Sequence, residues 1–269
     1  MATRRSTSRD PITEVRNALQ AAGLKLATRA RKPAPRKLGA KDRSPEAIAA
    51  RIDHTVLKPD ATRASITSLC AEANAFRFAS VCVNPIWVKH AARALDGIDV
   101  CTVIGFPLGA SSSAAKAREA RQAVRDGATE LDMVLQVGAL REAVPESSGA
   151  AIDGELAQLV LDDMAGVVEA SSGRLVKVIL ETCLLSRRQK IAACVLAATA
   201  GVDFVKTSTG FSSGGATAAD VRLMRSVVGT GIGVKASGGI RDRKDALAML
   251  RAGADRLGCS SSLAIIGAS

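Results

Sequence analysis

The chain has no tyrosine, one tryptophan and an aromatic content of 2% over its 269 residues. Proteins that stack nucleobases or sugar rings on aromatic side chains need more of them, so the composition argues against this kind of binding. Only two histidines occur, His54 and His90, and they lie far apart in the sequence. The six cysteines form no C-x-x-C pair, so no zinc motif can be written and we expect no metal.

Long uncharged apolar runs and a secretory hydrophobic region are missing too. We therefore expect no membrane span, reduced thiols and a cytoplasmic protein. The motif G-x-G-x-x-G does not follow the first expected strand, which argues against dinucleotide binding. Hydrophobic residues make up 47% of the chain, enough for the core of one large domain or two small ones.

Acidic residues are scarce at the start of the chain. Residues 1–43 contain 12 of the 37 Lys and Arg residues but only three acids, a formal charge of +9 out of +11 for the whole chain. The basic character therefore belongs to an extension, and we expect no nucleic-acid partner for the folded body.

The extension, residues 1–44, has three interpretations. Its composition favours a solvated, flexible arm, whereas its Arg-rich, acid-poor character also fits an organelle-targeting segment or an arm that docks on an anionic surface. One apolar face of a helix can be drawn within it. That face consists of Ile12, Val15, Leu19, Ala22 and Leu26. Ser44–Pro45 fits a helix start, so we expect the folded domain to span residues 45–269.

Past residue 45, short apolar strands alternate with amphipathic helices. The predicted strands are 51–57, 78–84, 100–106, 129–136, 175–182, 203–209, 231–237 and 255–261. The predicted helices include 115–126, 154–171, 187–200, 218–227 and 241–251. Eight such units favour an α/β fold of the (β/α)₈ TIM barrel type, with an open doubly wound sheet as the alternative.

Lys206 and Lys235 stand at matching places on consecutive predicted strands, "DFVKTST" and "GIGVKAS". Adjacent strands lie about 4.8 Å apart, so the two ammonium groups can come close. Like charges in a poorly solvated cavity ease the loss of a proton, which is one way to make a nucleophilic amine. Asp132 can hold Lys235 and relay protons, and Asp53 is a second candidate for that relay. The alternative is a set of ion pairs that only bind the barrel together.

Small residues follow the last two strands, in "KASGGI" and "GCSSS". TIM barrels commonly bind phosphate with these two loops, through backbone N–H groups and helix N-termini. The candidate phosphate residues are Gly238, Gly239, Gly258, Ser260 and Ser261. A tight turn is the alternative explanation for Gly-Gly.

Eight segments in order, among them "IDHTVLKPDAT", "ELDMVLQVGAL", "VDFVKTSTGF" and "VKASGGI", resemble the deoxyribose-phosphate aldolase family over residues 52 to about 262. The resemblance implies a metal- and cofactor-free class I aldolase that reversibly cleaves 2-deoxy-D-ribose 5-phosphate to acetaldehyde and D-glyceraldehyde 3-phosphate, in deoxyribonucleotide catabolism. It implies that Lys206 forms the Schiff base and that Lys235 and Asp132 donate and accept protons. The substrate contacts expected from it and from the strand ends are Thr209, Gly238, Gly239, Gly258, Ser260, Ser261, Lys177 and, at the small-aldehyde end, Cys82.

Three features depart from the family pattern. Gln136 follows the Asp132 strand where the family often has asparagine, and Phe211 stands where some relatives have a lysine near the phosphate. No C-terminal tyrosine is present to assist proton transfer. Two other functions stay open: a Schiff-base barrel for a different phosphosugar, and a nucleic-acid binder that uses the basic arm. The oligomeric state is open as well, and a homodimer is one assembly that the sequence allows.

Overall fold

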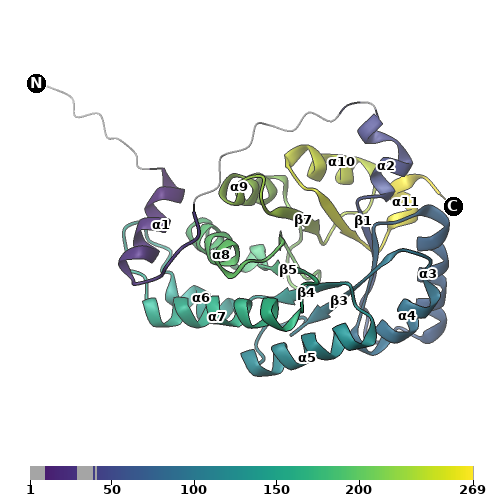
Figure 1. Ribbon diagram of the computed structural model, residues 1–269. Coiled ribbons are helices and arrows are strands. Elements are labelled where there is room, and N and C mark those ends of the chain that lie inside the picture. The colour runs from purple at the N-terminus through teal and green to yellow at the C-terminus, as the bar shows by residue number, and fades with distance from the viewer. Residues whose placement is uncertain (1–9, 29–38, 40, 269) are drawn as a thin grey trace, which may run out of the picture.

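Eight parallel strands close into a barrel in the strand order β1 to β8, with β8 paired to β1. The computed structural model describes residues 10–28, 39 and 41–268 (Figure 1). The strands are β1 (Ile52–Val56), β2 (Ser80–Val83), β3 (Asp99–Ile104), β4 (Glu130–Val134), β5 (Leu175–Ile179), β6 (Phe204–Lys206), β7 (Gly233–Ser237) and β8 (Arg256–Cys259). The predicted (β/α)₈ barrel is therefore confirmed, and the open doubly wound sheet is excluded.

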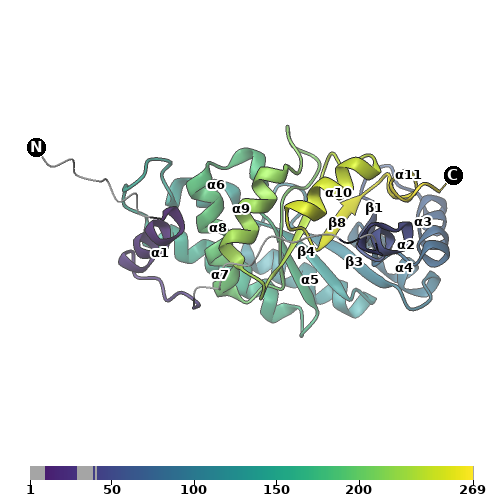
Figure 2. The same cartoon turned by 90° about the horizontal axis from the view of Figure 1, so that it is seen from above.

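Helices surround the barrel and separate its strands (Figures 1 and 2). They are α1 (Pro11–Ala21), α2 (Pro45–Ala49), α3 (Arg63–Phe76), α4 (Val88–Ala94), α5 (Ser113–Asp126), α6 (Val137–Ala143), α7 (Gly154–Ala170), α8 (Arg187–Ala200), α9 (Ala218–Val228), α10 (Arg243–Ala252) and α11 (Ser262–Ile266). Three short 3₁₀ helices add η1 (Lys41–Arg43), η2 (Pro85–Trp87) and η3 (Thr182–Leu184). All five helices predicted from the sequence are confirmed.

Local sequence explains where many of these helices begin and end. The side chains of Ser112 and Ser186 cap the first turns of α5 and α8. Gly127, Gly201 and Gly253 each end a helix with a positive φ, which costs glycine little. Each of these glycines leads into the next strand, as the Ala-Gly and Asp-Gly steps of the sequence predict.

The N-terminal extension contains a packed helix. In α1, Ile12, Val15 and Leu19 are buried, and the helix packs on α8, on the side of the barrel away from α11 (Figures 1 and 2). The apolar face predicted for this segment is thus confirmed for these three residues, whereas Ala22 caps the helix and Leu26 lies beyond its end. A solvated arm does not describe residues 11–24, because their apolar side chains join the barrel core. Residues 1–9, 29–38 and 40, which hold many of the basic residues, lie outside the described part.

The strands contribute nearly continuous buried residues, as expected for a parallel sheet covered on both faces. Within the described part of the chain, no helix has the length and apolar character to cross a membrane. The loops after the strands share one end of the barrel, because all strands run in the same direction. That end holds the cavity described next.

Candidate active site

Three predicted catalytic side chains meet inside the barrel. The register pairs Lys206 with Lys235 on neighbouring strands β6 and β7, as their matching sequence positions predict. Asp132, on β4, reaches both lysines: its Oδ2 lies 2.7 Å from the Nζ of Lys206 and 2.7 Å from the Nζ of Lys235. One carboxylate oxygen therefore receives hydrogen bonds from two ammonium groups.

A layer of further ion pairs lies around this group. Lys177 Nζ is 2.8 Å from Asp132 Oδ1, 2.5 Å from Glu130 Oε2 and 3.8 Å from Asp53 Oδ2. Arg256 bridges Asp53 at 2.8 Å and Glu130 at 2.7 Å. Asp53 also pairs with Lys235. These four cations and three carboxylates form one network, in which the lysines and carboxylates are all at most 4% exposed.

The network fixes the charge of its members. Burial by itself would raise the pKa of Asp132, but Lys177, Lys206 and Lys235 hold that pKa well below its usual range. Burial would likewise lower the pKa of Lys235, yet the carboxylates of Asp132 and Asp53 outweigh it and raise the pKa. Lys235 therefore stays a cation beside Lys206. The expected loss of a proton through like-charge repulsion does not apply to Lys235, because two carboxylates face it.

A cavity of about 730 Å³ opens above this network, and Lys206 lines it. Its other lining residues come mainly from the loops after β1, β6, β7 and β8. Of the predicted substrate residues, the cavity is lined by Thr209, Gly238, Gly239, Gly258 and Ser260. Asp132 and Lys235 lie beneath, fully buried. Lys206 is thus the member of the central triad that faces the cavity.

Two predicted substrate contacts are placed differently. Lys177 is fully buried and its ammonium faces three carboxylates, so its side chain is part of the ion network and does not line the cavity. Cys82 is fully buried as well, and its contact with the Cys101 thiol lowers its pKa. Both predictions followed from position at a strand end, but both side chains point into the filled interior of the barrel. Ser261, next to Ser260, is not among the residues that line the cavity.

Sequence reasoning missed Glu130 and Arg256. Each is the first residue of its strand, β4 or β8, whereas the candidate residues predicted from the sequence stand toward the C-terminal ends of the strands. The alternation of side chains along a strand is a signal that could have identified them, because residues two apart share a face. Glu130 lies on the face of Asp132, and Arg256 lies on the face of Gly258. The sequence also assigned no role to Glu181. This residue is buried with φ of 56°, and its carboxylate accepts hydrogen bonds from the N–H and the hydroxyl of Thr209. That contact fixes the loop after β6.

Two groups of buried side chains have the spacing of metal ligands: Cys82 with Cys101 and Asp132, and Asp53 with Cys101 and Glu130. Their carboxylates already bind lysine or arginine side chains. A divalent cation would have to displace these positive groups at short range, so the donor set does not suit a metal.

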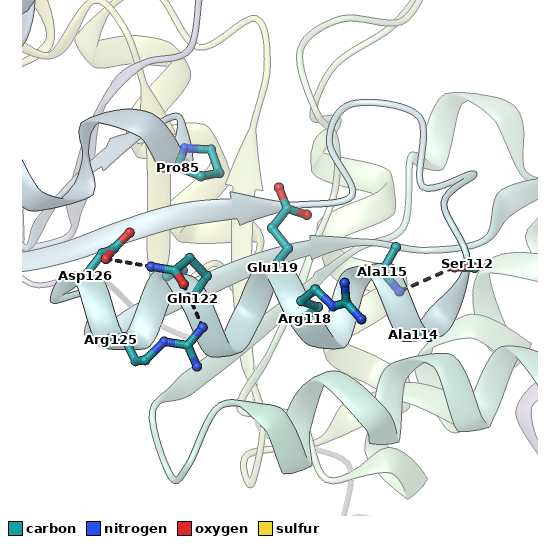
Figure 3. Close-up of a pocket in the computed structure, with 10 residues that line it drawn as sticks. Pro85, Ser112, Ala114, Ala115, Arg118, Glu119, Gln122, Arg125 and Asp126 are labelled. Atoms are coloured by element: carbon teal, nitrogen blue, oxygen red, sulfur yellow. Dashed lines mark hydrogen bonds between the residues drawn. The ribbon is translucent and has the colours of Figure 1, made fainter.

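A second cavity, of about 660 Å³, lies on the outer surface along α5 and beneath Pro85 (Figure 3). Arg118, Glu119 and Gln122 point from the helix toward it, and Gln122 is hydrogen-bonded to Asp126. No residue of the lysine network lines this cavity. Of the two cavities, the one at the barrel mouth is lined by a residue of this network, Lys206.

Known proteins resemble the chain over most of its length. The family model "DeoC/LacD family aldolase" matches residues 47–267. A deoxyribose-phosphate aldolase of Streptococcus pneumoniae (strain Taiwan19F-14) is 57% identical over 217 residues, which cover 80% of this chain and 93% of that protein.

Solved structures agree. A tetrameric deoxyribose phosphate aldolase from Aeropyrum pernix superposes with a TM-score of 0.73 and 34% identity, covering 94% of this chain and 96% of that one. An aldolase named QR15 superposes with a TM-score of 0.75 and 38% identity, covering 82% and 94%. The expected resemblance is thereby confirmed, and the chain belongs to the DeoC/LacD family of aldolases.

Proposed function

We propose that the chain reversibly cleaves 2-deoxy-D-ribose 5-phosphate to acetaldehyde and D-glyceraldehyde 3-phosphate through a Schiff base on Lys206. The observation that carries the proposal is that Lys206 alone of the central triad lines the cavity, while Lys235 and Asp132 support it from below. The 57% identity to a deoxyribose-phosphate aldolase supports the choice of substrate.

The first step is imine formation. The neutral amine of Lys206 attacks C1 of the open-chain aldehyde, and the carbinolamine then loses water to give a protonated imine. Lys206 is the lysine of the network that lines the cavity, so its amine is the one that the substrate aldehyde can reach.

The second step breaks the C2–C3 bond. A base removes the proton from the C3 hydroxyl, C3 becomes the aldehyde carbon of glyceraldehyde 3-phosphate, and the bonding electrons pass to the imine to form an enamine. Asp132 and Lys235 are the proton acceptor and donor for these transfers, since both contact the Lys206 nitrogen or its carboxylate partner. Asp53, paired with Lys235, is a further relay.

The last step regenerates the free amine of Lys206. The enamine takes a proton at C2, and water hydrolyses the resulting imine to release acetaldehyde and free Lys206. The imine nitrogen serves as the electron sink throughout, so this route uses no metal and no organic cofactor. Gly238, Gly239, Gly258 and Ser260 would lie along the phosphate end of the substrate, and Thr209 along its chain.

The biological setting follows from the substrate. We expect the enzyme to act in deoxyribonucleotide catabolism in the cytoplasm, with residues 45–269 as the catalytic barrel and residues 1–44 as an extension. Nucleic acid is not an expected partner. A homodimer is retained as the proposed assembly.

Turnover tests the proposal. Purified protein is incubated with 2-deoxy-D-ribose 5-phosphate, and acetaldehyde is measured with a coupled alcohol dehydrogenase. Wild type releases acetaldehyde, whereas Lys206→Ala, which keeps the circular-dichroism spectrum of the wild type, does not. A protein that cleaves another phosphosugar and not this one would contradict the choice of substrate.

A further inference from the structure

Lys58 lies in the loop that follows β1. Leu57 is buried behind it, and the side chain of Lys58 is exposed at the barrel mouth. Closure of the barrel pairs β1 with β8, so this loop stands beside the loop after β8. Lys58 therefore lines the same cavity as Ser260, Gly238 and Gly239.

The positive charge of Lys58 has no partner among the described residues. The cavity lining contains two cations, Lys58 and Lys206, and Lys206 is hydrogen-bonded to Asp132. Asp60 is the one carboxylate among the residues that line the cavity, and it forms no ion pair with Lys58. An exposed ammonium in a concave site is free to bind an anionic ligand.

Two backbone N–H groups that border the same cavity, those of Gly238 and Gly239, also lack a hydrogen-bond partner among the described residues. Gly238 and Gly239 have φ of 85° and 79°, a pair of positive values that only glycines adopt easily. Their N–H groups donate to no other residue in the described part of the chain. The loop after β6 adds Phe211, which is 51% exposed, and no cation. The anion-binding groups of the cavity are thus concentrated between Lys58 and the Gly-Gly loop.

We propose that Lys58 binds the phosphate of the substrate and sets the preference of the enzyme for phosphorylated over unphosphorylated sugars. The inference rests on the proposed function and extends it to one residue. Lys58 supplies the point charge, and the glycine N–H groups supply directed hydrogen bonds.

The test compares two substrates. The ratio of kcat/KM for 2-deoxy-D-ribose 5-phosphate to that for 2-deoxy-D-ribose is measured for wild type, Lys58→Gln and Lys58→Arg. A charge-assisted contact to phosphate predicts that Lys58→Gln lowers this ratio about tenfold or more, mainly through KM. Lys58→Arg keeps most of it. Lys25→Gln, which removes an exposed charge outside the cavity, is the matched control and leaves the ratio unchanged.

An unchanged ratio in Lys58→Gln overturns the proposal, as does an equal fall in Lys25→Gln, which would indicate general charge attraction. Inorganic phosphate gives a readout that does not depend on turnover. Isothermal titration should show weaker phosphate binding by Lys58→Gln than by wild type, and equal binding contradicts the assignment. If wild type releases no acetaldehyde, the proposed function fails, and the phosphate titration still decides the role of Lys58.

Discussion

The replacement Asp132→Asn should destabilise the protein chiefly by stranding Lys206. Lys177 keeps Glu130 at 2.5 Å as a partner, and Lys235 keeps Asp53. Among the described residues, Lys206 has an ion pair with Asp132 alone. The variant thus leaves one buried ammonium, not three, without a carboxylate.

The expected cost follows from this count. Removing one partner of a buried ion pair costs about 3–5 kcal/mol, and we take about 3 kcal/mol because Lys206 borders the cavity and water can reach it. Lys206→Met leaves Asp132 with Lys177 and Lys235, so we expect a cost below about 1 kcal/mol. The double variant removes the stranded charge, and it should regain about 2 kcal/mol relative to Asp132→Asn.

Urea unfolding measures this cycle. The single tryptophan, Trp87, supplies a fluorescence probe, and circular dichroism supplies a second one. Coincident transitions justify a two-state free energy for each variant. Additive effects of the two substitutions, or a double variant less stable than Asp132→Asn, would show that the stranded charge of Lys206 does not dominate the cost.

Three further predictions concern the extension, acid stability and metals. Leu19→Ala, which empties a fully buried site in α1, should lower the free energy of unfolding by about 2–3 kcal/mol, and the exposed Gln20→Ala should not; equal effects would show that α1 is not packed in solution. Burial opposes the ionisation of Asp53, but Lys235, Lys177 and Arg256 outweigh it and lower the pKa of Asp53 to about 2 from 3.8. The ionised carboxylate therefore stabilises the fold above about pH 4, and this stabilisation is lost as the pH falls toward about 2. Asp53→Asn should therefore give a shallower fall in the urea midpoint over that range, and an unchanged acid limb would count against the ion network. Addition of EDTA should leave the wild-type rate unchanged, and strong inhibition would indicate a metal-dependent aldolase.

The barrel could be predicted because its sequence pattern is local. Each strand is a short apolar run, and glycines such as Gly127, Gly201 and Gly253 end the helices between them. The pairing of Lys206 with Lys235 followed from equal positions on consecutive strands. The ends of the predicted strands were less accurate: β6 ends at Lys206, and residues 207–209 belong to the loop beyond it.

Side-chain direction inside the barrel was harder to predict. Lys177 and Cys82 are polar or reactive residues on strands, which made them candidates for the cavity, yet both are covered by neighbouring strands. Their place depends on which side chains fill each layer of the barrel, and that is set by the closure of all eight strands. Glu130 and Arg256 stand at the starts of their strands, and they join the network through Lys177 on β5, Asp53 on β1 and each other, contacts that depend on the same closure.

The most direct measurement is the site of borohydride trapping. The protein is incubated with 2-deoxy-D-ribose 5-phosphate and reduced with sodium borohydride, and the digested peptides are analysed by mass spectrometry. We expect a reduced adduct on Lys206, which lines the cavity, and none on the buried Lys235 or Lys177. An adduct on Lys235, or normal turnover without any adduct, would contradict it.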